Sequence, residues 1–248
     1  MKSYRETTCE YYSNWLGQDG ILCREFSGIR YLYSDQRNIV QYGYGNRFDI
    51  YVLCCKDRAV ISYGEAAADR LDAMKDAIGS MINAKEIGQI LERIFCCKAS
   101  YGIKYVFETM PVIHSEARVL TEEDYKDYET FFLKCNPGQD TGRLKEYFYE
   151  MVRDCMCVGL FADGGLVSCT DAPGMPYMER EVQEIGINTL QEYRGRGYAT
   201  AACSKCIQEI LDRHKAPMWS TEISNTASRK LAEKIGFAEF AEAIYITF

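Results

Sequence analysis

The spacing of apolar and polar positions divides the chain into two parts, and each part combines strands with helices. In the first part, short apolar runs are separated by turn signals, and two longer stretches repeat apolar residues at helical spacing. After a short leading segment, the expected elements are strands over 49–54, 59–63 and 102–107 and helices over 65–81 and 87–95. Pro111 follows them and cannot donate a ladder hydrogen bond. Residues 1–112 are therefore predicted to form an α+β accessory domain.

The second part, residues 113–248, has a more regular order of elements. Thr121-Glu122-Glu123-Asp124 predicts a capped helix start, and Asp163-Gly164-Gly165 predicts a hairpin turn. The expected strands are 117–120, 155–162, 166–170, 182–189, 218–221 and 240–247, and the expected helices are 121–135, 142–154, 198–214 and 225–236. The order of these elements is β-α-α-β-β-β-α-β-α-β, which is typical of an α/β fold.

A glycine-rich turn follows the predicted strand 182–189 and opens the next helix. Gly195 and Gly197 lack the Cβ atoms that would keep an anion away from the backbone, and they tolerate tight turn dihedrals. The first N–H groups of the following helix have no intrahelical partner, and the helix dipole is positive there. Arg194 and Arg196 add fixed positive charge. This stretch is predicted to bind a phosphorylated ligand.

The same turn carries a family resemblance. Arg194-x-x-Gly197-x-Ala199 resembles the (Gln/Arg)-x-x-Gly-x-(Gly/Ala) signature of the GCN5-related N-acetyltransferase (GNAT) family. Asn225-x-x-Ser228-x-x-Leu231, followed by Gly236-Phe237, is similar to a second motif of that family. The order of elements is also similar to that of the family's core, so the resemblance covers about residues 115–248 and implies a GNAT-like mixed central sheet with helices on both faces. For the first part it leaves two interpretations open, a degenerate GNAT-like half or an unrelated accessory domain.

The resemblance implies a ligand and the residues that hold it. In this family the turn binds the pyrophosphate of acetyl-CoA, and the preceding strand offers backbone groups to the pantetheine arm. The cofactor-binding residues implied here are Ile187, Asn188, Thr189, Arg194, Gly195, Arg196, Gly197, Tyr198, Ala199, Thr200, Asn225 and Ser228. The implied reaction is acetyl transfer from acetyl-CoA to an amine, which attacks directly within a ternary complex.

Such a reaction needs a base, because an alkyl ammonium has a pKa of about 10. The candidates are two acids of the central strand, Glu184 and Glu181, with Glu222 in reserve. Residues alternate between the two faces of a strand, so either Glu184 or Gln183 faces the substrate.

The general acid is less clearly marked than the base. Many relatives place a Tyr directly after the Leu of the second motif, but Ala232 follows Leu231 here. Tyr198 and Tyr245 are candidates by residue type alone. A thiol with a pKa of about 8.5 is already a fair leaving group, so the alternative is that no general acid is needed.

Composition narrows the class of partner. A net charge of -7 and a pI near 5.1 argue against nucleic-acid binding and permit a cationic small substrate. No uncharged run approaches the ~18 residues of a membrane helix, and cytoplasm is the default location. Twelve cysteines accompany only two histidines, so no metal is expected, and Cys203, Cys206 and the adjacent pairs 54–55 and 96–97 are predicted to pack in the core.

Two other classes of function stay open. The first is a CoA-binding regulatory or interaction module without turnover. The second is a dinucleotide-binding enzyme, although Thr200 stands where its fingerprint needs a third glycine. The acceptor is a small-molecule amine or a peptide amine, and residues 1–112 are expected either to wall the acceptor pocket or to form a homodimer.

Overall fold

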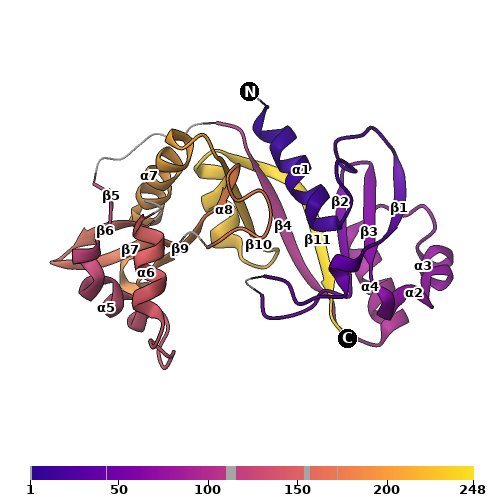
Figure 1. The fold of residues 1–248 in the computed structure, drawn as a ribbon, viewed down its shortest axis with the longest axis horizontal. Coiled ribbons are helices and arrows are strands. Elements are labelled where there is room, and N and C mark those ends of the chain that lie inside the picture. Colours follow the sequence, from indigo (N-terminus) through magenta and orange to yellow (C-terminus); the bar gives the residue numbers. More distant parts are fainter. Residues whose placement is uncertain (1, 43, 110–115, 154–156, 172) are drawn as a thin grey trace.

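The computed structural model describes residues 2–42, 44–109, 116–153, 157–171 and 173–248, which form two sheets with helices packed on them (Figure 1). The larger sheet has seven strands in the order β1-β3-β2-β11-β4-β10-β8, and the smaller has four in the order β5-β6-β7-β9. The strands of the larger sheet are β1 (Gly28–Tyr33), β2 (Ile50–Cys55), β3 (Arg58–Tyr63), β4 (Ser100–Phe107), β8 (Val182–Glu184), β10 (Ala216–Glu222) and β11 (Phe237–Ile246). Those of the smaller are β5 (Arg118–Val119), β6 (Val158–Ala162), β7 (Gly165–Asp171) and β9 (Gly186–Thr189).

The larger sheet combines strands from both parts of the chain. Its C-terminal strand β11 lies between β2 and β4 and pairs antiparallel with both, whereas β10 pairs antiparallel with β4 and parallel with β8. The predicted boundary at residue 112 lies outside the described residues, and one sheet spans the sequence on either side of it. The division into two domains stays a prediction.

Helices cover both faces of the larger sheet, as the fold prediction required. Strand β2 shows why: Ile50 and Val52 join one buried cluster, while Tyr51 and Leu53 join another. The first cluster packs against α2 (Glu65–Ala68), α3 (Leu71–Ile78) and α4 (Ala84–Phe95), and the second packs against α1 (Tyr4–Leu16). The mixed α/β fold is therefore confirmed.

Two predictions for the first part are wrong. Residues 4–16 form helix α1 where only a short leading segment was expected. The helix predicted over 65–81 breaks into α2 and α3, and Arg70 at the break donates a hydrogen bond to the Ile94 carbonyl at the end of α4. The contact is tertiary, so the apolar spacing, which predicts one helix here, does not reveal it.

The second part follows the predicted order of elements. Helices α5 (Tyr125–Cys135) and α6 (Leu144–Arg153) precede β6, α7 (Tyr198–Asp212) follows β9, and α8 (Thr226–Lys234) precedes β11. Short 3-10 turns cover Asp35–Arg37, Glu122–Asp124 and Gln191–Tyr193. The buried side chains of α5, α6, α7 and the smaller sheet share one core cluster.

The strand predicted over 182–189 is interrupted, and the interruption separates the two sheets. Strand β8 pairs with β10, whereas β9 pairs with β7 in the other sheet. Between them, the Ile185 amide donates to the Met218 carbonyl at 3.1 Å. Beyond Ile185, β9 and β10 diverge, and the edge of β9 that faces β10 has no strand partner among the described residues.

Candidate functional site

A cleft of about 680 Å³ opens where β9 and β10 diverge. Its walls come from β9, the glycine-rich turn, the start of α7, the end of β10 and α8. Eleven of the twelve predicted cofactor-binding residues line it: Ile187, Asn188, Thr189, Arg194, Gly195, Gly197, Tyr198, Ala199, Thr200, Asn225 and Ser228. The twelfth, Arg196, is not part of the lining, and its guanidinium lies 5.2 Å from the centre of the Tyr193 ring.

The backbone of the turn explains why glycine stands at two of these positions. Gly195 and Gly197 have φ values of 75° and 86°, in the left-handed region that other residues avoid. A Cβ atom added at either would meet no heavy atom within 4 Å, so the main chain is open toward the cleft. Gly197 is also the N-cap of α7 and provides no side-chain cap. The first N–H groups of α7 are therefore available to an anion.

Residues of the second motif are fixed by their own hydrogen bonds. The Asn225 side chain accepts from the Ser228 amide at 3.1 Å and so caps α8. The Ser228 hydroxyl accepts from the Trp219 indole at 3.2 Å. Across the cleft, the Arg194 Nε donates to the Thr189 carbonyl at 3.1 Å, which ties the turn to the end of β9. These bonds hold both walls before any ligand binds.

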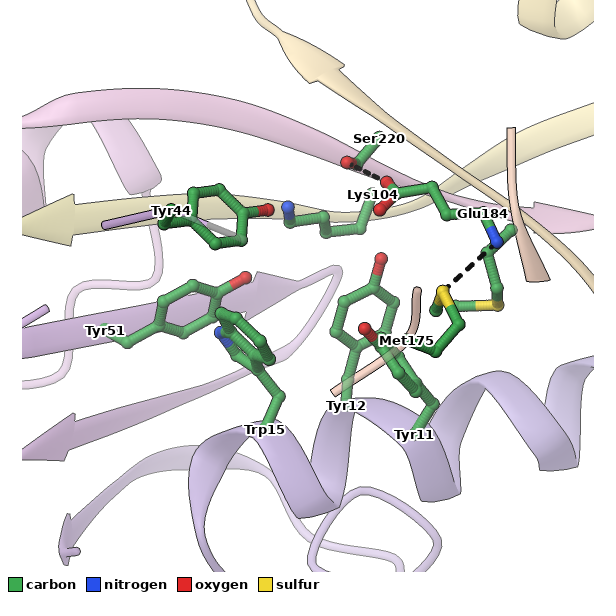
Figure 2. A pocket seen from close by; sticks show the side chains of 10 residues that line it. Tyr11, Tyr12, Trp15, Tyr44, Tyr51, Lys104, Met175, Glu184 and Ser220 are labelled. Atoms are coloured by element: carbon green, nitrogen blue, oxygen red, sulfur yellow. Dashed lines mark hydrogen bonds between the residues drawn. The ribbon is translucent and has the colours of Figure 1, made fainter. Parts of the chain in front are cut away.

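Of the predicted acids, only Glu184 lies next to the cleft. It ends β8 and lines a second pocket, which shares Ser220 with the cleft (Figure 2). The Ser220 hydroxyl donates to the Glu184 carboxylate, and the Gln183 side chain instead donates to the Pro173 carbonyl at 2.9 Å. The alternation of the strand therefore turns Glu184, and not Gln183, toward the pocket.

The other candidate groups lie elsewhere. Glu181 is exposed before β8 begins and borders a separate surface hollow with His214. Glu222 is exposed at the end of β10. Tyr198 lines the cleft, whereas Tyr245 is on β11, where burial raises its pKa to about 12. His114 lies outside the described residues.

The second pocket was not predicted from the sequence. Half of its ten lining residues are aromatic, and they come from elements distant in the sequence. They are Tyr11, Tyr12 and Trp15 of α1, Tyr51 of β2, Lys104 of β4, Glu184 of β8, Met218 and Ser220 of β10, and the loop residues Tyr44 and Met175. One signal for α1 was present, because Ser3 and Glu6 form a capping box. No comparable signal marks Tyr44, Tyr51 or Lys104, which come together only in the folded chain.

Burial shapes the electrostatics of this pocket. It raises the pKa of the Tyr11 and Tyr12 hydroxyls, because a phenolate is poorly solvated there, and the Glu184 charge adds to the effect. Burial lowers the pKa of the Lys104 amine, and attraction to Glu184 opposes that shift. The tyrosines are therefore neutral hydrogen-bonding groups near pH 7.

The cysteine predictions hold in part. Cys203, Cys206 and Cys54 are buried, as predicted, and Cys55 and Cys97 are partly buried. Cys96 is exposed, which contradicts its predicted place in the core: it is the C-cap of α4 with φ 54° and so does not continue the buried face of that helix. Within the described ranges, no three His, Cys, Asp or Glu side chains form a group suited to a metal ion.

Comparisons with known proteins bear on the same half of the chain. A family model described as GNAT acetyltransferase matches residues 163–245. The chain is 37% identical over 59 residues to the uncharacterized N-acetyltransferase YdfB of Bacillus subtilis, covering 24% of this chain and 23% of that protein. A second Bacillus subtilis relative, YdaF, is 33% identical over 88 residues, covering 34% of this chain and 47% of that one. These matches span less than half the length of either relative.

A solved structure shows the same fold. The GCN5-related N-acetyltransferase from Sphaerobacter thermophilus superposes with a TM-score of 0.52 at 14% identity, covering 64% of this chain and 55% of that chain. The family match over residues 163–245 supports the resemblance that the predicted motifs carry, and the structural likeness shows that the chain has this fold. Among the described residues, no helix has the length and apolar character needed to cross a membrane.

Proposed function

We propose that this protein is an N-acetyltransferase that uses acetyl-CoA as co-substrate and acetylates an amine by direct attack within a ternary complex. One observation carries the proposal: the open edge of β9 and the glycine turn form a cleft of about 680 Å³ that reaches Ser220, the residue hydrogen-bonded to Glu184. A thioester held along β9 and an amine beside Glu184 would thus meet at one point.

The main chain suits this co-substrate. The uncapped start of α7 would hold the pyrophosphate, with charge-assisted hydrogen bonds each contributing about 1.5–3 kcal/mol. Arg194 lies at the rim of the cleft and would add positive charge. The unpaired edge of β9 would bond the amides of the pantetheine arm as a further strand does, and its N–H groups near Ile187 would stabilise charge on the thioester oxygen.

Glu184 is the proposed base. The acceptor enters as an ammonium and loses one proton to the Glu184 carboxylate, directly or through water. Its nitrogen then attacks the thioester carbon, so that a C–N bond forms as the C–S bond breaks. The second N–H proton neutralises the departing thiolate, and the products are an N-acetyl amide, free CoA and one proton released from Glu184. Tyr198 is the only predicted acid that lines the cleft among the described residues.

The proposal is tested by amine-dependent formation of CoA from acetyl-CoA. The chain exposes thiols at Cys23 and Cys96, so free CoA is measured by chromatography and not with a thiol reagent. Glu184→Gln keeps the side-chain shape and removes the base, and we expect the rate to fall by about 10²–10⁴-fold with unchanged CoA affinity. Glu181→Gln is the matched control and leaves the rate unchanged.

Two outcomes would favour the alternative of a binding module without turnover. One is tight CoA binding with no amine-dependent product for any acceptor. The other is a slow acetyl-CoA hydrolysis that Glu184→Gln leaves unaltered. The walls of the second pocket include α1 and β2, which supports a role for residues 1–112 in enclosing the acceptor. Homodimer formation stays a prediction.

A further inference from the structure

Three hydrogen-bond donors in the aromatic pocket have no acceptor. Lys104 is only 6% exposed, and its amine makes no hydrogen bond or ion pair with any described residue. The Tyr51 hydroxyl and the Trp15 indole N–H are also buried without a hydrogen-bond partner in the described part of the chain. Buried polar groups are normally paired, and an unpaired buried cation is especially unfavourable. Three such groups lining one pocket, from α1, β2 and β4, indicate a missing anionic partner.

A buried arginine, Arg37, adds positive charge behind Trp15 and Tyr51. Arg37 is fully buried, and its guanidinium lies 5.8 Å from the Trp15 ring and 5.4 Å from the Tyr51 ring. It donates to the Trp15 carbonyl at 2.6 Å, but its Nε and Nη1 atoms have no acceptor among the described residues. The Lys104 amine itself lies 6.0 Å from the centre of the Tyr12 ring and 5.6 Å from that of Tyr245. Such contacts compensate a buried charge weakly.

The single acid of the pocket lies apart from these donors. Figure 2 shows the Lys104 amine directed toward the Tyr44 hydroxyl, on the side where Tyr51 and Trp15 lie, whereas the Glu184 carboxylate is bonded to Ser220. No ion pair joins Lys104 to Glu184 in the described structure, although each lines the same pocket. The pocket thus has its cationic group toward Tyr44 and its anionic group at Ser220.

We propose that the acceptor is a small free amino acid, whose carboxylate pairs with Lys104, Tyr51 and Trp15 while its amine lies at Glu184. This inference rests on the proposed acetyl transfer, because it assigns the acceptor of that reaction. In this orientation the amine of the acceptor lies next to Ser220, where the pocket meets the cleft. The aromatic walls suit an apolar side chain.

The size of the pocket limits the acceptor. As it stands, the cavity is only about 10 Å³, close to the space one water molecule needs. Tyr44 is 49% exposed, while Tyr11, Tyr12, Trp15 and Tyr51 are buried. An acceptor therefore enters by displacing Tyr44, and the fixed walls of α1 and β2 exclude long chains. A peptide would also lack the free carboxylate beside its reacting amine.

Matched acceptors test the carboxylate directly. L-alanine, L-leucine and L-phenylalanine are each compared with their own amide, which keeps the amine and side chain but removes the negative charge. We expect kcat/KM for CoA formation to favour the best acid over its amide by at least about tenfold, as loss of a charge-assisted hydrogen bond predicts. Equal or better use of the amides would overturn the inference and leave the acetyltransferase proposal standing.

Substitution of Lys104 tests whether this residue causes the preference for the acid over its amide. Lys104→Met keeps the length of the side chain, and we expect it to raise KM for the amino acid and abolish the preference over the amide. Lys98→Met, at an exposed lysine just before β4, is the control and retains the preference. If Lys104→Met fails to fold, Tyr51→Phe removes one donor without changing the ring and is expected to reduce the preference. A preference unaltered in the folded variant would overturn the assignment.

A binding measurement separates this inference from the reaction. Trp15 lines the pocket and Trp219 lines the cleft, so a Trp219→Phe protein reports the pocket through Trp15 fluorescence. An emission change with the amino acid but not its amide, lost in Lys104→Met, supports the inference even if no acceptor yields CoA. The absence of a selective change, together with no turnover, would overturn both proposals.

Discussion

The two halves of the site are built in different ways. The cleft is formed mainly by consecutive segments around one turn, and its central features are open main chain at Gly195 and Gly197 and the start of α7. The neighbouring pocket is formed by side chains from α1, β2, β4, β8 and β10, and it is nearly filled. A backbone-lined cleft depends on conformation, whereas a side-chain pocket depends on the identity of each residue. The first therefore suits a common co-substrate and the second a particular acceptor.

Substitution at Gly197 should damage the cleft alone. Gly197→Asp forces a side chain into a φ of 86° and places a carboxylate where an anion is expected. We expect CoA affinity, measured by calorimetry, to fall by at least about 100-fold, or roughly 2.7 kcal/mol. Trp15 fluorescence and its response to the acceptor should not change.

A matched control isolates the ligand effect from backbone strain. Gly138 has a φ of 83° and open space around it, lies in the turn after α5 and does not line the cleft. Gly138→Asp should lower the stability by a similar amount and leave CoA affinity intact. Equal losses of affinity in both variants would mean that the turn has no special role in binding.

Ser220 should affect the meeting point of the two halves. It lines both the cleft and the pocket, and its hydroxyl holds the Glu184 carboxylate. Ser220→Ala removes that bond, and we expect kcat to fall by about tenfold because a charge-assisted bond contributes roughly 1.5–3 kcal/mol. Calorimetry should show CoA affinity changed by less than about twofold.

The exposed Ser224 provides the comparison for that result. Ser224 lies between β10 and α8, and its hydroxyl donates to the carboxylate of Glu222, the last residue of β10. Ser224→Ala should leave kcat and CoA affinity unaltered. If Ser220→Ala weakens CoA binding as much as turnover, Ser220 belongs functionally to the cleft and does not orient the base.

The contrast in construction explains what the sequence could predict. The glycine turn, the start of α7 and the Asn225 cap are local patterns, and each was readable within a few residues. Eleven of twelve cofactor-binding candidates consequently line one cleft, and their role in binding stays a prediction. Lys104 was unreadable for the opposite reason. Lys104 occupies an ordinary position in strand β4, and it is buried only because α1 packs over that strand.

The break at Ile185 shows the same limit inside the predicted region. Residues 182–189 have the composition of one continuous strand, and nothing local marks a change of partner. The change occurs because β8 pairs with β10 in the larger sheet, whereas β9 pairs with β7 in the smaller sheet. Periodicity identified the strand, but only the sheet order showed that its two halves diverge and open the cleft.

A substitution remote from both halves should alter neither and give the smallest effect. Asp124 accepts two hydrogen bonds from the Arg118 guanidinium, at 2.6 and 2.8 Å, and completes the capping box with Thr121. The Arg118 bonds, with the Thr121 backbone and side chain, lower the Asp124 pKa to about 2. We expect Asp124→Asn to reduce the free energy of unfolding by about 1 kcal/mol at pH 7, since Arg118 is half exposed and partly screened.

The pH dependence of that loss distinguishes the charge from the cap. The folded pKa lies below the unfolded value of about 3.9, so the contribution is complete above that value and is lost as pH falls through about 2. The difference in urea midpoint between wild type and Asp124→Asn should therefore be constant from pH 7 to 5 and shrink toward pH 3. A difference that stays constant to pH 3 would assign the effect to the hydrogen-bonded cap alone. Acetyl transfer by the folded variant should match wild type, because Asp124 lines neither the cleft nor the aromatic pocket.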